Sequence, residues 1–343
     1  MSATSRQQRH RDRQWILTLG VDEAAGALAL ARLGEADRAY RRLRHRLRHR
    51  SEHTRRVDLS PNGDDPLHDF RVAIRRLRSH LRAYREQLPL RNKRHKALRR
   101  LARGTNPARD TEVAVAWLRS QLPALGAVER ADAEAFIADL LAPSNGTRID
   151  PTRAVLEDWP PLAARLRKRL QRHLKRRRAC HGPGTKGTGI SFGRATAGCA
   201  RAQTARLGKS LRRIRSLADP QVAHRARIQT KRLRYLLEPW RDVLPSAVAV
   251  VERLRRLQDA LGELHDGQVL GERLAAAMDP GADPLSRPGL THLSALLRVQ
   301  QVERFSTLER EHLGAPIDTL VDEARAVADI IASWPHPETS TAV

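Results

Sequence analysis

The sequence has few of the residues that build sheet-based cores. Aromatic residues make up only 3% of its 343 residues, and hydrophobic residues make up 40%. Most of these hydrophobic residues are Ala, Leu and Val, a profile that favours helices packed on helices. The chain is long enough to bury one large core or two of ordinary size. We therefore expect an all-α protein.

Cysteines and long apolar runs are also scarce. The two cysteines, Cys180 and Cys199, form no C-x-x-C pair, so the sequence predicts neither a disulfide framework nor a zinc site. The first residues are polar and basic without an apolar segment behind them, and no run approaches 18 apolar residues. These features argue against secretion and membrane insertion, and they favour a reducing, cytoplasmic location.

Acidic residues are also few compared with basic ones. The chain has 64 Lys+Arg against 38 Asp+Glu, a net charge of +26, and only seven of the 64 are lysines. In a folded protein such an excess implies a polyanionic partner. An arginine bias from a genome rich in G and C is the alternative, and composition alone leaves both open. Arginine suits phosphate because its planar fork donates two parallel hydrogen bonds.

Segments rich in Pro and Gly divide the chain at 142–152, 181–189 and 280–289. Between them the apolar spacing is helical. We expect helices over 13–56, 66–87, 91–103, 109–121, 128–141, 154–179, 191–216, 220–242, 246–261, 265–277 and 289–333. We also expect a disordered basic N-terminus over 1–12 and a flexible tail over 334–343.

The chain repeats itself. Residues 67–89 align with 223–245 without a gap at an offset of 156, and the same register later places Asp110 opposite Asp266. Matches at His, Asp and Pro are rarer coincidences than matches at Arg in an arginine-rich chain. We therefore predict a duplicated helical unit. The first half covers about 13–145, the linker about 142–152, and the second half about 153–333.

A cationic stripe runs along the same helix of both copies. In the first copy, an arc of about 100° holds His68, Arg71, Arg75, Arg78, Arg82 and Arg85. In the second copy the stripe contains His224, Arg227, Lys231, Arg234 and Arg241, and Glu238 interrupts it. Like charges at this spacing destabilise a free helix, so their presence in both copies suggests that a ligand neutralises them. A solvated helix face is the alternative.

The other basic segments give weaker signals. Arg38, Arg42, His45 and His49 share one face of the first long helix. Residues 162–178 form a basic amphipathic helix that could equally contact a membrane surface or a nucleic acid.

His68 and His224 could be structural, metal-binding or catalytic. Neither lies in an H-x-x-x-H or H-E-x-x-H pattern, so we predict no metal site, and an imidazole in line with arginines can bind a phosphate oxygen.

The segments HDFRVAIRRLRSHL and HRARIQTKRLRYLLE, each followed by a leucine-rich segment that ends in Asp, resemble the two halves of a CHAD domain, the conserved-histidine α-helical domain. The resemblance covers about 13–333. It implies two pseudo-symmetric helical bundles around a central basic groove or pore that binds inorganic polyphosphate. The binding residues carried over by position are His68, Arg71, Arg75, Arg78, His224, Arg227, Lys231 and Arg234.

The resemblance also implies that Asp110 and Asp266 orient arginines or cap helix starts. The two halves differ near these aspartates: Arg109 stands opposite His265, and Asn106 stands opposite Gly262, which belongs to an LG-x-x-x-D turn.

We therefore expect a binding module for inorganic polyphosphate that collects on polyphosphate granules and needs no cofactor. An RNA- or DNA-binding protein is the first alternative, although the stripes lack aromatic residues for base stacking. A polyphosphate-processing enzyme is the second. Against it, the glycine-rich segment 187–193 lacks the Lys-Ser/Thr of a phosphate-binding loop. Glu309 and Glu311 also do not continue into the E-x-E-x-K signature of triphosphate-tunnel domains. We predict no catalytic residues.

Overall fold

The computed structural model describes residues 15–50, 66–142, 151–180, 190–278 and 286–335. Over these ranges the elements are helices, with one isolated β-bridge between Gly20 and Ser191, which confirms the all-α class. The N-terminus expected to be disordered and all but the first two residues of the expected tail lie outside the described residues. Among the described helices, none combines the length and the apolar character that a membrane span requires.

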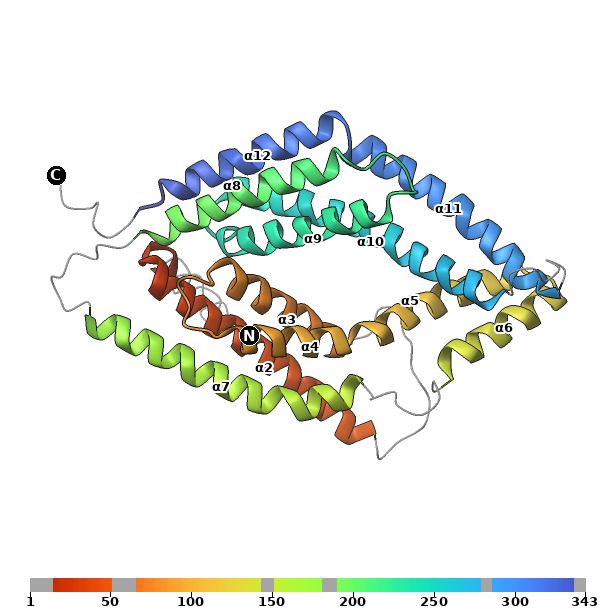
Figure 1. Ribbon diagram of the computed structural model, residues 1–343, viewed down its shortest axis with the longest axis horizontal. Helices are drawn as coiled ribbons and strands as arrows, with labels where there is room; N and C mark the ends of the chain where they lie inside the picture. Colours follow the sequence, from red (N-terminus) through yellow and green to blue (C-terminus); the bar gives the residue numbers. More distant parts are fainter. Residues whose placement is uncertain (1–14, 51–65, 143–150, 181–189, 279–285, 336–343) are drawn as a thin grey trace.

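The helices follow the expected segments closely (Figure 1). In chain order they are α2 (Val21–Arg50), α3 (Pro66–Ala83), α4 (Asn92–Gly104), α5 (Asn106–Gln121), α6 (Ala127–Leu141), α7 (Pro151–Cys180), α8 (Phe192–Leu211), α9 (Pro220–Leu237), α10 (Pro245–Ala277), α11 (Pro288–His312) and α12 (Ala315–Ala332). A proline begins α9, α10 and α11. Its fixed φ suits the first helical turn, where its missing N–H has no partner to lose.

Two groups of helices meet in the middle of the molecule. In the first group α2 packs along α3 and α7, and in the second α8 packs along α9 and α12. Contacts of α3 with α9 and of α2 with α8 join the groups. We had assigned the segment of α7 to the second half, but α7 packs on α2 and α4 of the first. The duplication at an offset of 156 and the central groove or pore stay predictions.

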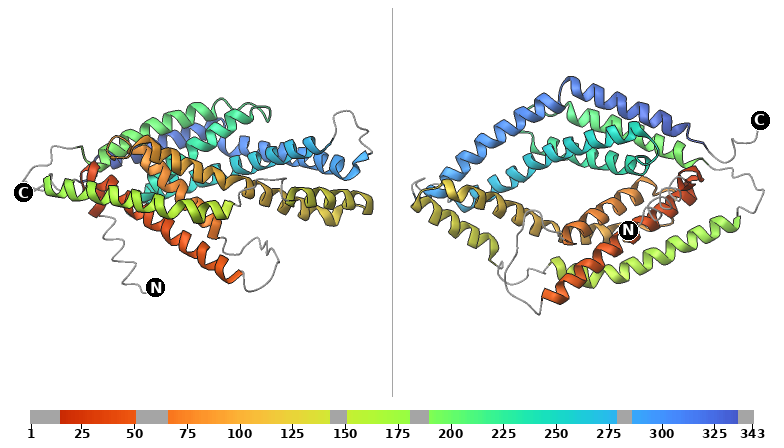
Figure 2. Two further views of the ribbon diagram at one scale, coloured as in Figure 1. Left: turned by 60° about the horizontal axis from the view of Figure 1, so that its bottom comes forward. Right: turned by 180° about the vertical axis from the view of Figure 1, so that it is seen from behind.

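Two hydrophobic cores hold these helices together. The larger core spans both groups and contains five fully buried aromatic residues: Trp159, Trp240, Tyr84, Phe70 and Phe192. The smaller core lies at the end of the molecule where α5 and α6 meet α10 and α11 (Figure 2). Val115, Leu118 and Phe136 pack there against Leu274 and Leu293. Burial of apolar surface in the larger core, which contains residues of both α3 and α9, therefore fixes these two helices relative to each other.

Three expected helix boundaries were wrong, and a glycine lies at each. The expected helix over 13–56 is interrupted before α2, where Gly20 forms the β-bridge with Ser191. The expected turn at Gly262 is absent because α10 continues through it, and Gly262 lies beneath the side chain of Arg227. The expected helix over 289–333 breaks at Gly314, whose φ of 64° is a left-handed conformation that side chains disfavour. A helical pattern with a glycine therefore did not reveal whether the helix would end there.

Candidate functional site

The cationic stripes of α3 and α9 converge. The charge of Arg75 on α3 lowers the pKa values of both Arg227 and Lys231 on α9. Further along, burial and then the charges of Arg82 and Arg78 of α3 lower the pKa of Arg232 on α9. We call this set the α3–α9 cluster, and its members are Arg75, Arg78, Arg82, Arg227, Lys231 and Arg232. Because α3 and α9 come from the two groups of helices, the cluster spans their interface.

Lys231 is held in the least favourable environment for a charge within the cluster. Burial, followed by the charges of Arg227 and Arg75, lowers its pKa from 10.5 to about 7. Burial also lowers the pKa of Arg227, and the negative charge of Asp266 opposes this effect. The Nε of Arg227 is buried and makes no hydrogen bond with the described residues. An anion placed here would relieve the repulsion and provide an acceptor for that N–H.

Two aspartates lie beside the cluster. Asp110 of α5 and Asp266 of α10 both raise the pKa of Arg227 and also that of His265. The two carboxylates only partly offset the cations, because the net effect on each of these pKa values remains a decrease. The role of these aspartates in orienting arginines stays a prediction.

A histidine pair adjoins the second-half end of the cluster. The rings of His224 and His265 lie 5.0 Å apart. Burial, and then the charge of Arg227, lowers the pKa of each imidazole. The Nδ1 of His224 is buried without a hydrogen-bond partner among the described residues. His68, the predicted counterpart of His224, is instead exposed on the first turn of α3. Sequence reasoning did not include His265 among the binding residues.

Arg71 does not lie on an open face, although we expected it to share the stripe of α3. It is only 3% exposed, and its guanidinium donates to the carbonyl oxygen of Thr105. That carbonyl lies at the break between α4 and α5. A helix end leaves carbonyls without an intrahelical partner, so the break provides the acceptor. Its predicted counterpart Arg227 meets the uninterrupted α10 and finds no such acceptor.

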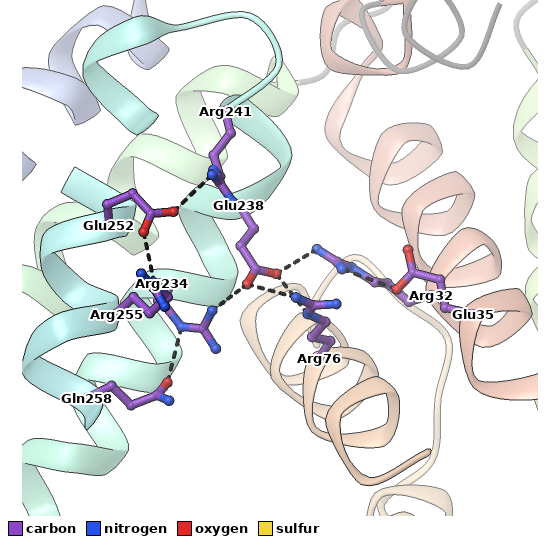
Figure 3. A network of polar contacts seen from close by, with 9 residues as sticks. All are labelled: Arg32, Glu35, Arg76, Arg234, Glu238, Arg241, Glu252, Arg255 and Gln258. Atoms are coloured by element: carbon purple, nitrogen blue, oxygen red, sulfur yellow. Dashed lines mark hydrogen bonds and ion pairs between the residues drawn. The ribbon is translucent and has the colours of Figure 1, made fainter. Parts of the chain in front are cut away.

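Arg234 is also engaged within the protein, around Glu238 (Figure 3). The Glu238 side chain is only 8% exposed and accepts from Arg234 Nη1 at 2.9 Å. It also pairs with Arg76 Nε at 3.1 Å and Arg32 Nη2 at 3.5 Å. These arginines come from α9, α3 and α2. The carboxylate that interrupts the stripe in the sequence therefore joins three helices beside the cluster.

The weaker stripe on α2 is exposed to solvent. Arg38, Arg42 and His45 are all exposed, and Arg42 pairs with Asp69 of α3 at 2.6 Å. The backbone of His49 belongs to α2, but its side chain lies outside the described residues. Nothing in these contacts connects the α2 stripe with the α3–α9 cluster.

The structure adds cations that the analysis of the stripes missed. Arg99 and Arg103 of α4 lower the pKa of Arg78, after the larger effect of burial. Arg206 of α8 acts in the same way on Arg232. Arg99 and Arg103 are spaced i, i+4 on the polar side of an amphipathic helix, which is a signal that the sequence carried. Their proximity to α3 depends on tertiary packing and was not available from the sequence.

The fold and the cluster together define an all-helical protein with partly buried cations at the interface of two helical groups. The family model of the CHAD domain matches residues 38–275, more than half of the chain, so the chain belongs to the CHAD domain family. The crystal structure of the CHAD domain from the plant Ricinus communis is similar, with a TM-score of 0.58 and 21% identity. The match covers 90% of this chain and 93% of that one. A search of curated proteins finds no match.

Proposed function

We propose that this CHAD protein binds long-chain inorganic polyphosphate through the α3–α9 cluster. The observation that supports the proposal most strongly is that Arg75, Arg227 and Lys231 are partly buried together, where burial and mutual repulsion disfavour the charges on Arg227 and Lys231. Such an arrangement destabilises the free protein unless an anion neutralises it. Polyphosphate carries about one charge per phosphate along a flexible chain, comparable to a nucleic acid backbone. One chain can therefore contact the cations of both helices.

Nucleic acid is the competing ligand. The α3–α9 cluster contains no aromatic side chain that could stack on bases, and recognition by charge alone fits the phosphoanhydride chain better. The proposal is for binding without turnover. Incubation with polyphosphate and Mg²⁺ or Mn²⁺ should therefore release no phosphate. In cells that make polyphosphate granules, we expect the protein to collect on them.

The test uses neutralising variants of each half of the cluster. Arg75→Gln with Arg78→Gln, and Arg227→Gln with Lys231→Gln, should each weaken binding of long polyphosphate by about tenfold or more, since one buried charge-assisted contact contributes about 1.5–3 kcal/mol. Tripolyphosphate, which contacts fewer of these cations at once, should lose less, because each half raises the effective concentration of a long chain at the other. Binding is measured by calorimetry, and circular dichroism checks the fold.

The control is Arg213→Gln with Arg298→Gln. Arg213 lies in the segment after α8, Arg298 lies on α11, and both are exposed, so this variant should leave the affinity nearly unchanged. Competition of long polyphosphate against RNA and duplex DNA at near-physiological salt then identifies the ligand. Unchanged affinity and salt dependence in folded cluster variants would rule out this site. A nucleic acid that displaces polyphosphate would rule out the ligand.

A further inference from the structure

The outward face of α7 is a second cationic surface, separate from the α3–α9 cluster. One side of α7 is buried through Trp159, Leu166 and Leu170. Over residues 165–176 the opposite side, within an arc of about 100°, consists of exposed Arg165, Lys168, Arg172, Lys175 and Arg176. These five side chains extend over roughly 16 Å of helix at about 1.5 Å per residue. We call them the α7 face.

Towards its N-terminal end α7 itself carries two exposed carboxylates, Glu157, which pairs with Arg153, and Asp158. Three carboxylates of α2 pair with arginines of α7 that lie outside the α7 face. Asp37 of α2 pairs with Arg167, while Asp22 and Glu23 pair with Arg177 and Arg178. No ion pair joins a residue of the α7 face to a described carboxylate. The neighbouring α4, which packs against α7, contains no acidic residue and exposes Lys93, Lys96 and Arg100. The five cations of the α7 face therefore have no ion-pair partner among the described carboxylates.

The flanking helix of the other group shows that this charge is not a general result of an arginine-rich composition. α12 packs along α8 as α7 packs along α2, and these two helices form opposite edges of the molecule (Figures 1 and 2). The exposed face of α12 is acidic. Its carboxylates pair with arginines in four ion pairs: Asp318 with Arg212, Asp322 with Arg325, Glu323 with Arg253, and Asp329 with Arg201. The same architectural position is thus neutralised on one edge and left cationic on the other.

We infer that the α7 face binds a second stretch of polyphosphate, so that one protein molecule bridges two chains. This inference rests on the proposed function of the α3–α9 cluster. The α7 face lies at the edge of the molecule and α7 packs on α2 and α4, whereas the cluster lies between α3 and α9. A chain bound at one surface therefore leaves the other surface open to a second chain.

The chemistry of the two helices favours a ligand recognised by charge alone. Among the described side chains, none of the exposed large hydrophobic residues belongs to α4 or α7, so neither helix presents a large apolar side chain for insertion into a bilayer. The α7 face also has no aromatic residue for stacking on single-stranded bases. Multiple exposed Lys and Arg residues along a helix instead suit a flexible polyanion, with a steep dependence on salt.

The experiment mixes two populations of long polyphosphate, one carrying a fluorescent donor and one an acceptor, and measures energy transfer when the protein is added. The wild-type protein should bring the two labels together at protein concentrations below saturation. Lys168→Glu with Arg172→Glu should reduce this transfer at least fivefold. The same variant should bind tripolyphosphate at the cluster within twofold of the wild type, because both substitutions lie outside it. Arg213→Glu with Arg298→Glu, which changes the charge equally, should bridge chains normally.

A second variant separates failure of this inference from failure of the proposed function. Arg75→Gln with Lys231→Gln should lose both tripolyphosphate affinity and bridging. If it binds tripolyphosphate like the wild type, the proposed function of the cluster is wrong. If Lys168→Glu with Arg172→Glu bridges chains like the wild type, the second surface is wrong while the cluster stands. Loss of binding to phosphatidylserine vesicles or duplex DNA in that variant, with bridging intact, would assign the α7 face to that ligand and overturn the inference.

Discussion

Lys231 connects burial, protonation and binding in one residue. Its pKa in the folded protein is about 7, below the ordinary value of 10.5, so the unfolded state binds more protons between these two values. The stability of the free protein should therefore rise with pH from about 7 to 10.5, and the destabilisation is fully present below pH 7. A bound polyanion reverses the electrostatic balance and favours the protonated amine. Above pH 7, binding should be accompanied by proton uptake.

The pH dependence of binding tests this coupling. Between pH 7.5 and 9 the affinity for long polyphosphate should fall by up to about tenfold per pH unit, the limit for uptake of one proton. Lys231→Arg should flatten this slope, because a guanidinium remains charged over the whole range. Affinity measured by calorimetry at constant ionic strength gives both slopes, and Lys168→Arg on the exposed α7 face is the control. Equal slopes in the wild type and Lys231→Arg would show that Lys231 does not take up the proton.

The sequence predicted which residue types carry the charge, but not which of them are accessible. Arg71 and Arg75 lie one helical turn apart on the same stripe, yet Arg71 is buried against Thr105 while Arg75 faces α9. The difference arises from the end of α4, a segment that contacts α3 only in the folded protein. Likewise, the pattern marked Glu238 as an interruption of the stripe, and the structure makes it the partner of three arginines.

At the level of helices, apolar spacing and prolines located most of the elements, because both act locally. Two features depend on tertiary packing and could not be predicted from local sequence: which glycine ends a helix, and which helix α7 packs against. Gly262 and Gly314 are both glycines in helical patterns, but the first packs beneath Arg227 and the second adopts a left-handed φ. The grouping of α7 with α2 was also missed, because the Pro/Gly-rich segment at 142–152 resembles a boundary between halves. Chain connectivity alone does not show against which helix a long segment packs.

Glu238 should be important for joining α2, α3 and α9. Glu238→Gln removes the central negative charge, leaves the mostly buried Arg234 without its carboxylate partner and leaves Arg32 paired with Glu35 alone. Breaking a buried ion pair in this way destabilises by about 3–5 kcal/mol, so the melting temperature should fall by several degrees. Thermal denaturation followed by circular dichroism measures the change.

The matched control for Glu238 is Glu157→Gln. Glu157 also pairs with an arginine, at 2.8 Å from Arg153, but both side chains are exposed, and surface pairs contribute little. The melting temperature of this variant should stay close to that of the wild type. An equal, small effect of both substitutions would mean that the Glu238 contacts do not hold the three helices together.

At the level of the whole molecule, a net charge of +26 makes the free protein repel itself, and the structure concentrates part of this charge on the α3–α9 cluster and the α7 face. Self-repulsion destabilises a compact state, and a ligand that binds only the folded state stabilises it by mass action. The two surfaces should therefore make folding stability sensitive to polyanions in a way that simple salt does not reproduce.

Long polyphosphate should raise the melting temperature by several degrees in low salt, since a ligand at 100 times its Kd contributes about 2.7 kcal/mol. The shift should shrink as NaCl is added, because released counterions make binding salt-dependent. Scanning calorimetry with orthophosphate at equal ionic strength is the control and should show a smaller shift. Arg75→Gln with Lys231→Gln should lose most of the rise in melting temperature caused by long polyphosphate. Lys168→Glu with Arg172→Glu should lose a smaller part of it, because only the cluster combines repulsion with burial. If orthophosphate stabilises the protein as much as long polyphosphate does, the protein responds to ionic strength and not to a chain that spans its two helical groups.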